Sequence, residues 1–248
     1  MPLRRLHRPI VRAAATSVLA ATRAAAQEPA PPRPPPASVP APDPAADSAA
    51  AAVPFVCEPG GLADGQEYGC RLLARPTVER FPKGDVYWHL ARYATREQAA
   101  VAGRFTDVVT EVDGVVWLHR FGLEGDAPRA GTQTATVGPL PMPRAAVYEI
   151  DVFYAVVPAG ARTPAQTHPG PAAWYVLEGA QCVETSKGAV VAETGEGAVA
   201  APAGTPLQWV NTGGGAERAL FVLVRDPGRR LATPAPRWKP KGACDAPP

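Results

Sequence analysis

The sequence lacks the short motifs that mark several large enzyme classes. It has no Gly-x-Ser-x-Gly nucleophile elbow, no His-Glu-x-x-His zinc motif and no phosphate-binding Gly-x-x-x-x-Gly-Lys loop. Only four of the 248 residues are histidine, and the four cysteines contain no Cys-x-x-Cys pair. The sequence therefore gives no support to a serine hydrolase, a zinc protease, a P-loop nucleotide-binding enzyme or a compact cysteine metal site.

The sequence also lacks a cluster of basic residues interleaved with aromatic ones. Its formal net charge of +2 arises from the first 26 residues, which hold five arginines and no acidic residue. The remaining chain has 20 basic and 23 acidic residues, a net charge of 20 − 23 = −3. This balance gives no reason to expect nucleic acid as a partner.

Residues 1–26 are typical of a cleavable export signal. They combine a basic start, a short apolar stretch and three consecutive alanines before Gln27. We therefore expect an exported protein, periplasmic or secreted. Because Arg23 lies close to the expected cleavage point and the apolar stretch is rich in alanine, two alternatives stay open. The segment could be a transit peptide, or the protein could have a different start residue. The stretch is too short to span a bilayer, so no stable membrane insertion is expected.

The composition divides the rest of the chain into three parts. Residues 27–54 are rich in proline and alanine, which favours extended segments and predicts a disordered linker. Residues 55–232 contain the apolar, β-branched runs needed for a core. Residues 233–248 are similar in composition to the linker, which predicts a flexible tail. Contacts of Trp238 and Cys244 with the domain would attach this tail to it.

An even number of cysteines in an exported chain favours disulfides, and four cysteines permit three complete pairings. Cys57 and Cys70 are close in sequence and separated by a glycine-rich segment. Cys182 lies in a predicted strand, where it also fits the role of a small buried apolar residue. The partners of Cys182 and Cys244 stay open.

Strand patterns dominate residues 83–225. A short helix is expected after Thr95, because Thr95 and Gln98 form a capping-box pattern and Gly103 ends the segment. Asp113-Gly114 predicts a tight hairpin turn between two strands. The predicted strands are 83–93, 106–112, 115–121, 146–157, 173–177, 180–185, 189–193, 198–201, 207–210 and 219–225. Many short strands with almost no helix predict an antiparallel sandwich or barrel.

Two segments carry a specific resemblance. Gly160 and Gly179 bracket PAGARTPAQTHPGPAAWYVLEG, and Pro202, Gly204 and Asn211 frame a second segment, GEGAVAAPAGTPLQWVN. These segments resemble the two signature motifs of the cupin superfamily, and a wider stretch, about residues 69–226, resembles a bacterial cupin-domain subgroup. The resemblance implies an all-β fold, a cupin-type double-stranded β-helix (jelly-roll barrel) with core motifs in 146–226, additional N-terminal strands and one short helix.

The resemblance also implies where metal ligands would lie. The two histidines of the first motif fall on Gln166 and His168, its acidic ligand on Ala172, and the histidine of the second motif on Leu207. A first-row metal needs several imidazole or carboxylate donors, and an amide oxygen is a weak substitute. His168 and Gln166 are therefore weak metal candidates, a divalent transition metal has little support, and no cofactor is expected.

Strand alternation places residues 166 and 168 on one inward face, with Trp174 and Trp209 also facing inward. We expect a cavity lined by Gln166, His168, Trp174 and Trp209, with the first two as polar anchors for a small, partly apolar ligand. Two other interpretations stay open: His168 as an internally hydrogen-bonded histidine, and the tryptophans as core packing.

Three functional hypotheses follow. The leading one is an exported, non-catalytic or weakly catalytic binder of an unidentified small molecule, without a tightly held metal. The second is a metal-dependent oxygenase or isomerase using His168, Gln166 and a donor from elsewhere, such as His89 or His119. The third is a structural module that self-associates, which makes a homodimer a possible assembly. No catalytic residue is assigned.

Overall fold

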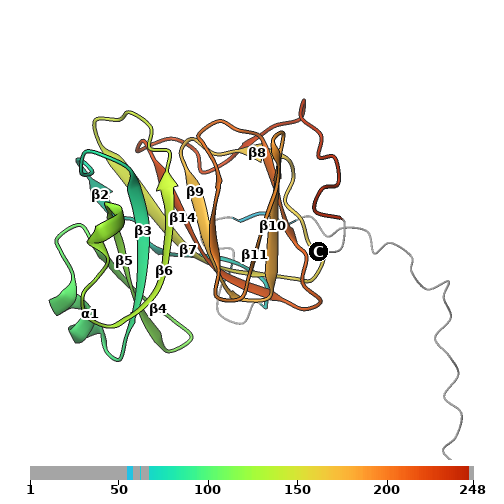
Figure 1. Cartoon of the computed structure of the whole chain (residues 1–248). Coiled ribbons are helices and arrows are strands. Elements are labelled where there is room, and N and C mark those ends of the chain that lie inside the picture. Colours follow the sequence, from blue (N-terminus) through green and yellow to red (C-terminus); the bar gives the residue numbers. More distant parts are fainter. Residues whose placement is uncertain (1–54, 58–61, 63–66, 246–248) are drawn as a thin grey trace, which may run out of the picture. The chain divides into compact units, whose positions relative to one another are not determined.

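Three antiparallel sheets make up the domain (Figure 1). The computed structural model describes residues 55–57, 62 and 67–245. The predicted export signal and most of the linker and its boundary lie outside these residues. No helix in the described ranges is long and apolar enough to cross a membrane.

The central sheet has the order β1-β7-β14-β9-β12, with β2 beside β7. Its strands are β1 (Gly69–Ala74), β2 (Thr77–Val78), β7 (Tyr148–Val157), β9 (Ala172–Glu178), β12 (Gly197–Ala201) and β14 (Glu217–Arg225). The second sheet has the order β11-β10-β13-β8-β15. It consists of β8 (Gln166–Thr167), β10 (Ala180–Thr185), β11 (Gly188–Glu193), β13 (Leu207–Asn211) and β15 (Thr233–Pro234).

The chain alternates between these two sheets in a way that defines a jelly roll. Strands β7, β9, β12 and β14 belong to the central sheet, and the strands between them, β8, β10, β11 and β13, belong to the second. The first and last of these eight strands, β7 and β14, pair side by side along nine residues. This is the double-stranded β-helix expected from the sequence.

The third sheet contains the three predicted N-terminal strands and one strand that was not predicted, and it lies outside the barrel. Its order is β4-β5-β3-β6, with β3 (Val86–Tyr93), β4 (Val108–Val112), β5 (Val115–Gly122) and β6 (Thr132–Leu140). Helix α1 (Arg96–Ala102) begins after Thr95, whose side chain accepts a hydrogen bond from the Gln98 amide at 3.2 Å. Asp113 and Gly114 adopt the positive φ angles of the predicted hairpin.

Strand alternation explains why the central sheet contacts two layers. On β7, Ile150, Val152 and Tyr154 join the apolar cluster shared with Trp88 and Trp117 of the third sheet. The alternate residues of β7, Phe153 and Ala155 among them, face the barrel interior. The central sheet is therefore buried on both faces, which accounts for its nearly continuous apolar sequence.

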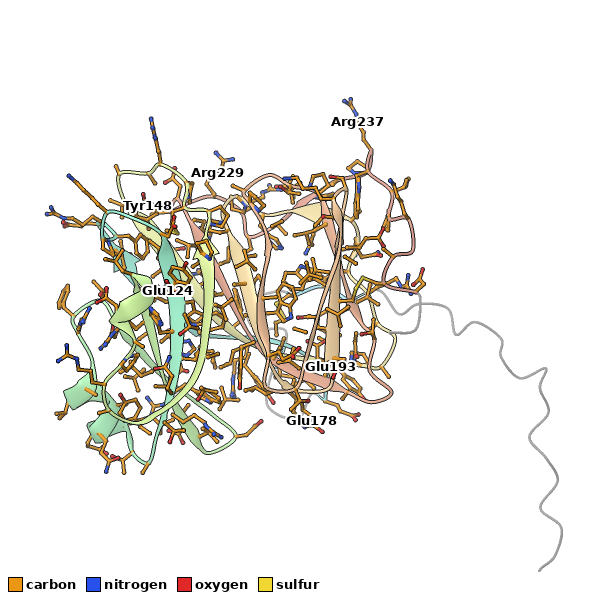
Figure 2. The ribbon with its side chains drawn as sticks, viewed as in Figure 1. Glu124, Tyr148, Glu178, Glu193, Arg229 and Arg237 are labelled. Atoms are coloured by element: carbon orange, nitrogen blue, oxygen red, sulfur yellow. A yellow bond between two sulfur atoms is a disulfide. The ribbon has the colours of Figure 1, made fainter. Side chains whose placement is uncertain are left out.

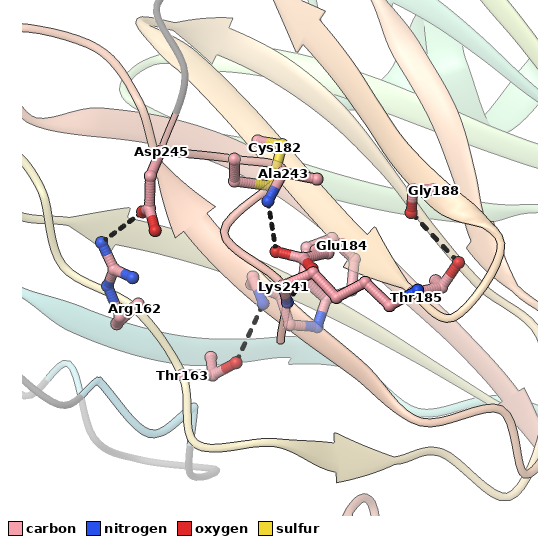
Figure 3. The surroundings of a disulfide bond; sticks show 11 residues. Arg162, Thr163, Cys182, Glu184, Thr185, Gly188, Lys241, Ala243 and Asp245 are labelled. Carbon is pink, nitrogen blue, oxygen red and sulfur yellow. Dashed lines mark hydrogen bonds and ion pairs between the residues drawn. A yellow bond between two sulfur atoms is a disulfide. The ribbon is translucent and has the colours of Figure 1, made fainter. Parts of the chain in front are cut away.

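Two disulfides attach segments outside the sheets to the barrel. Cys57 pairs with Cys70 on β1, and Cys182 on β10 pairs with Cys244. Figure 3 shows the second bond, beside which the Glu184 carboxylate accepts hydrogen bonds from the backbone amides of Lys241 and Ala243. The segment predicted as a flexible tail is thus held on the outer face of β10 as far as residue 245.

Candidate functional site

The barrel interior holds a cavity of about 80 Å³. That space accommodates several water molecules or a ligand of about one ring. Its walls come from both barrel sheets and are mainly apolar. The aromatic and polar side chains among them are Phe55, Phe153, Phe221, Trp209, Gln166, His168, Gln181, Arg162, Thr163 and Asn211.

His168 is the most constrained polar group in this wall. Its side chain is buried, and Nδ1 lies 2.7 Å from the carbonyl oxygen of Leu231. Because a carbonyl only accepts, Nδ1 carries the proton in the neutral ring and Nε2 is left as a hydrogen-bond acceptor. Burial lowers the pKa of His168, and the bond to Leu231 opposes this shift only in part. The imidazole is therefore neutral near pH 7.

Nε2 of His168 is buried and has no hydrogen-bond partner among the described residues. The same is true of Oε1 of Gln181 and Nε of Arg162, which belong to side chains lining the cavity. Buried polar atoms nearly always have a partner in folded proteins. The cavity therefore presents two acceptors and one donor suited to a polar ligand or water.

The structure brings three of the four predicted ligand-binding residues together. Gln166, His168 and Trp209 line the cavity. Trp174 does not, which corrects that part of the expectation. Its ring is fully buried with its centroid 5.0 Å from that of Trp209, in an edge-to-face contact. Trp174 is thus core packing that supports Trp209.

The four positions of the expected metal site all belong to the barrel interior. Gln166 and His168 line the cavity, Gln166 is the strand partner of Leu207, and Ala172 and Leu207 belong to one inward apolar cluster. The residues do not fit a first-row metal, because two of the four positions carry alkyl side chains with no donor atom. Within the described ranges, no group of three or more His, Cys, Asp or Glu side chains is arranged to hold a metal ion.

The suggested substitute donors lie elsewhere. His89 on β3 contacts Oγ1 of Thr136 at 3.0 Å and the carbonyl oxygen of Leu123 at 2.8 Å. His119 on β5 accepts from Nε1 of Trp88 at 3.3 Å and pairs with Thr110 at 2.8 Å. Both histidines belong to the third sheet and have both ring nitrogens engaged. They are structural residues and not donors for the barrel.

A second depression lies at the mouth of the barrel. This open groove, of about 560 Å³, is lined by Thr167, His168, Pro169, Ala203, Gly204, Gly228, Arg229, Arg230 and Thr233. His168 lines both the groove and the interior cavity. Residues 226–232, here called the strap, contribute Arg229 and Arg230 to the groove and Leu231 to the cavity. The strap therefore shapes both spaces.

Sequence reasoning missed several cavity residues. Gln181 follows from alternation, since it shares the inward face of β10 with Val183. Phe221 on β14 could be predicted as a cavity residue in the same way, once that strand is known to be buried on both faces. The carbonyl of Leu231 has no sequence signal, because any residue supplies one. Only the path of the strap identifies it.

These features define an all-β protein with a cupin-type barrel, an interior cavity and an additional outer sheet. No protein-family model matches the sequence, and no curated protein matches it.

The solved structures similar to this chain include cupin superfamily proteins. One, from Desulfitobacterium hafniense, is 12% identical with a TM-score of 0.29, and the match covers 31% of this chain and 68% of that one. A cupin 2 domain-containing protein from Halorhodospira halophila is 20% identical with a TM-score of 0.30, covering 35% and 58%. A DMSP lyase from Ruegeria pomeroyi is 18% identical with a TM-score of 0.31, covering 35% and 43%.

Proposed function

We propose that this protein binds a small, partly apolar molecule inside the barrel and that it is non-catalytic or weakly catalytic. The observation that carries the proposal is the interior cavity, whose aromatic wall surrounds a buried imidazole. Nε2 of this imidazole has no hydrogen-bond partner among the residues that the structure describes. Such a cavity, mainly apolar with a few polar groups that fix orientation, is the usual form of a small-molecule site.

The polar atoms define what the ligand must offer. Nε2 of His168 and Oε1 of Gln181 accept hydrogen bonds, so the ligand is expected to carry at least one hydroxyl or N–H donor beside its apolar part. Since Ala172 and Leu207 provide no donor atom, the proposal includes no tightly held metal.

Export is part of the same proposal. Two disulfides involve all four cysteines of the chain, and stable disulfides form chiefly outside the cytosol. This pairing supports the expectation drawn from residues 1–26. Sequencing the N-terminus of protein recovered from the periplasm or the medium tests it, and an intact start at Met1 in cytosolic protein would contradict it.

Ligand-observed NMR with two single-ring probes tests the binding proposal. Phenol has a hydroxyl donor, whereas anisole has the same ring with the donor methylated. We expect phenol to bind more tightly than anisole, and His168→Ala to remove the difference. His89→Ala is the matched control, since it removes a buried histidine from the third sheet and should leave both affinities unchanged. Equal binding of the probes, or none, would contradict the proposal.

Metal content is the complementary test. The native protein, purified without a metal-affinity tag and dialysed against a mild chelator, is expected to contain no stoichiometric metal. Stoichiometric metal that survives dialysis would favour the alternative of a metal-dependent oxygenase or isomerase built on His168 and Gln166.

A second candidate function is self-association through a strand edge. Strand β11 is the outer strand of the second sheet, and its Val190 and Val191 are 42% and 48% exposed. Exposed apolar edge strands favour pairing with a second chain. Sedimentation equilibrium of the native protein and of Val190→Lys tests this function, which a monomeric native protein would contradict.

A further inference from the structure

We propose that the ligand is an organic anion, whose apolar part enters the barrel cavity and whose carboxylate or phosphate is held in the groove by Arg229 and Arg230. This inference rests on the proposed function and adds the chemical class of the ligand. It starts from the common wall of the two spaces, because His168 lines both of them.

The charge of the groove is positive and unopposed by its own walls. Arg229 and Arg230 line it, and none of its other lining residues is acidic. Neither arginine makes a salt bridge to another residue in the part of the chain that the structure describes. Asp226, at the start of the strap, is exposed and does not line the groove.

Arg225, just before the strap, forms ion pairs, whereas Arg229 and Arg230 form none with the described residues. Arg225, at the end of β14, is buried and bonded to Glu149 and Asp151 on β7. Arg75 also contacts both carboxylates. Two carboxylates thus balance two guanidinium groups in this network. Arg229 and Arg230, by contrast, carry charges that no acidic lining residue of the groove balances.

The strap holds the two arginines at the groove through its backbone. The carbonyl oxygen of Arg229 accepts a hydrogen bond from Nη1 of the buried Arg225 at 2.8 Å. Two residues further on, Leu231 accepts the bond from Nδ1 of His168. The strap is anchored on both sides of Arg230, so its position at the groove is set before any ligand arrives.

Two exposed arginines lie at the same end of the barrel. Figure 2 shows Arg229 and Arg237 at one end and Glu178 and Glu193 at the opposite end. An anion that approaches Arg229 and Arg237 is attracted by their charges, whereas at the opposite end Glu178 is paired with Arg218 at 3.1 Å. The guanidinium groups then suit carboxylate or phosphate oxygens, and the unpartnered Nε2 of His168 accepts a donor from the same molecule.

Three probes that share a ring hydroxyl as a donor for Nε2 of His168 test the proposal on the full chain. They are the 4-hydroxy derivatives of benzoate, of phenyl phosphate and of the uncharged benzamide, named below without the prefix. We expect one or both anions to bind at least about tenfold more tightly than benzamide, the gain expected of a charge-assisted hydrogen bond. The anion that gains more identifies carboxylate or phosphate as the recognised group. Added salt should weaken anion binding and leave benzamide unchanged.

Arginine variants test which residues cause the tighter binding of the anions. Arg229→Gln combined with Arg230→Gln should remove the advantage of the anions while benzamide affinity stays unchanged. Arg237→Gln is the matched control, since Arg237 is exposed at the same end of the barrel but lines neither space. Its affinities should equal those of the native protein.

The outcomes separate this proposal from the one on which it rests. One outcome is that benzamide binds and loses affinity in His168→Ala while neither anion binds more tightly than benzamide. In that case the proposal of an anion site is wrong and the proposal of a barrel site stands. If no probe binds, both proposals fail. If inorganic phosphate alone binds as tightly as phenyl phosphate, the groove holds anions independently of the cavity, which also overturns the inference.

Discussion

Nδ1 of His168 lies 2.7 Å from the carbonyl oxygen of Leu231, so the first barrel motif and the strap are joined directly by a hydrogen bond. The bond fixes the neutral tautomer and leaves Nε2 as an acceptor. It also makes the position of the strap depend on the imidazole. The walls of the cavity and of the groove are therefore linked through one side chain.

Buried neutral histidines predict a loss of stability in acid. Burial lowers the pKa of His119 to about 3 and also lowers the pKa of His168, whereas an unfolded histidine titrates near ~6.5. Below that pH the unfolded histidines bind protons that the folded ones do not, so their contribution to stability falls as pH drops from ~6.5 toward 3, while Glu217 acts in the opposite direction above its unfolded pKa. In thermal unfolding across this window, the native protein should therefore lose stability relative to His119→Gln as pH falls. An unchanged slope would contradict this assignment.

Glu217 predicts the opposite pH dependence of stability, up to about pH 8. Its carboxylate is fully buried with both oxygens unpartnered among the described residues, and burial raises its pKa to about 8. Between the unfolded value near ~4.5 and 8, the folded state binds the extra proton, so stability decreases as pH rises, by up to about 5 kcal/mol.

Glu217→Gln should therefore raise the melting temperature at pH above 8 and change it little at pH 5. Glu193→Gln is the control, since Glu193 is exposed on β11 and should leave the pH dependence as it is. A stabilisation of equal size at both pH values would show that packing, and not charge burial, is responsible.

The two disulfides are expected to differ in their contribution. The Cys182–Cys244 pair spans 62 residues and the Cys57–Cys70 pair spans 13. Closing the longer loop removes more entropy from the unfolded chain, about 4 kcal/mol against about 3 kcal/mol. Thermal unfolding of the two double Cys→Ala variants should show the larger loss for the first pair. The reverse order would mean that the residues around Cys70 depend more on their bond.

Restoring donors at the four motif positions should create a metal site. Gln166→His, Ala172→Glu and Leu207→His, combined, place three donors around His168 on walls that already face one interior. We expect calorimetric binding of Co²⁺ or Mn²⁺ by this variant and none by the native protein. Adding His168→Ala to the triple variant should weaken binding at least about tenfold. No gain by the triple variant would show that these positions do not converge.

Local pattern predicted much of the secondary structure because its signals are short-range. Asp113-Gly114 specifies a hairpin through its own backbone preferences, and Thr95 caps its helix three residues away. Strand β6 (Thr132–Leu140) was missed, because its sequence TQTATVGPL has few apolar residues and contains a proline. Its pairing with β3 is what makes it a strand.

The sequence by itself determined the all-β class, the two glycine-framed motifs and the apolar residues at two of the four positions where the cupin resemblance places metal ligands, since these depend on local spacing and residue type. Only the tertiary structure decided that Trp174 supports Trp209 from behind, that His89 and His119 lie outside the barrel, and that Cys182 meets Cys244. It also decided that Arg229 and Arg230 border the space reached by His168. Each of these depends on contacts between residues distant in sequence, which follow from the crossing of strands between sheets.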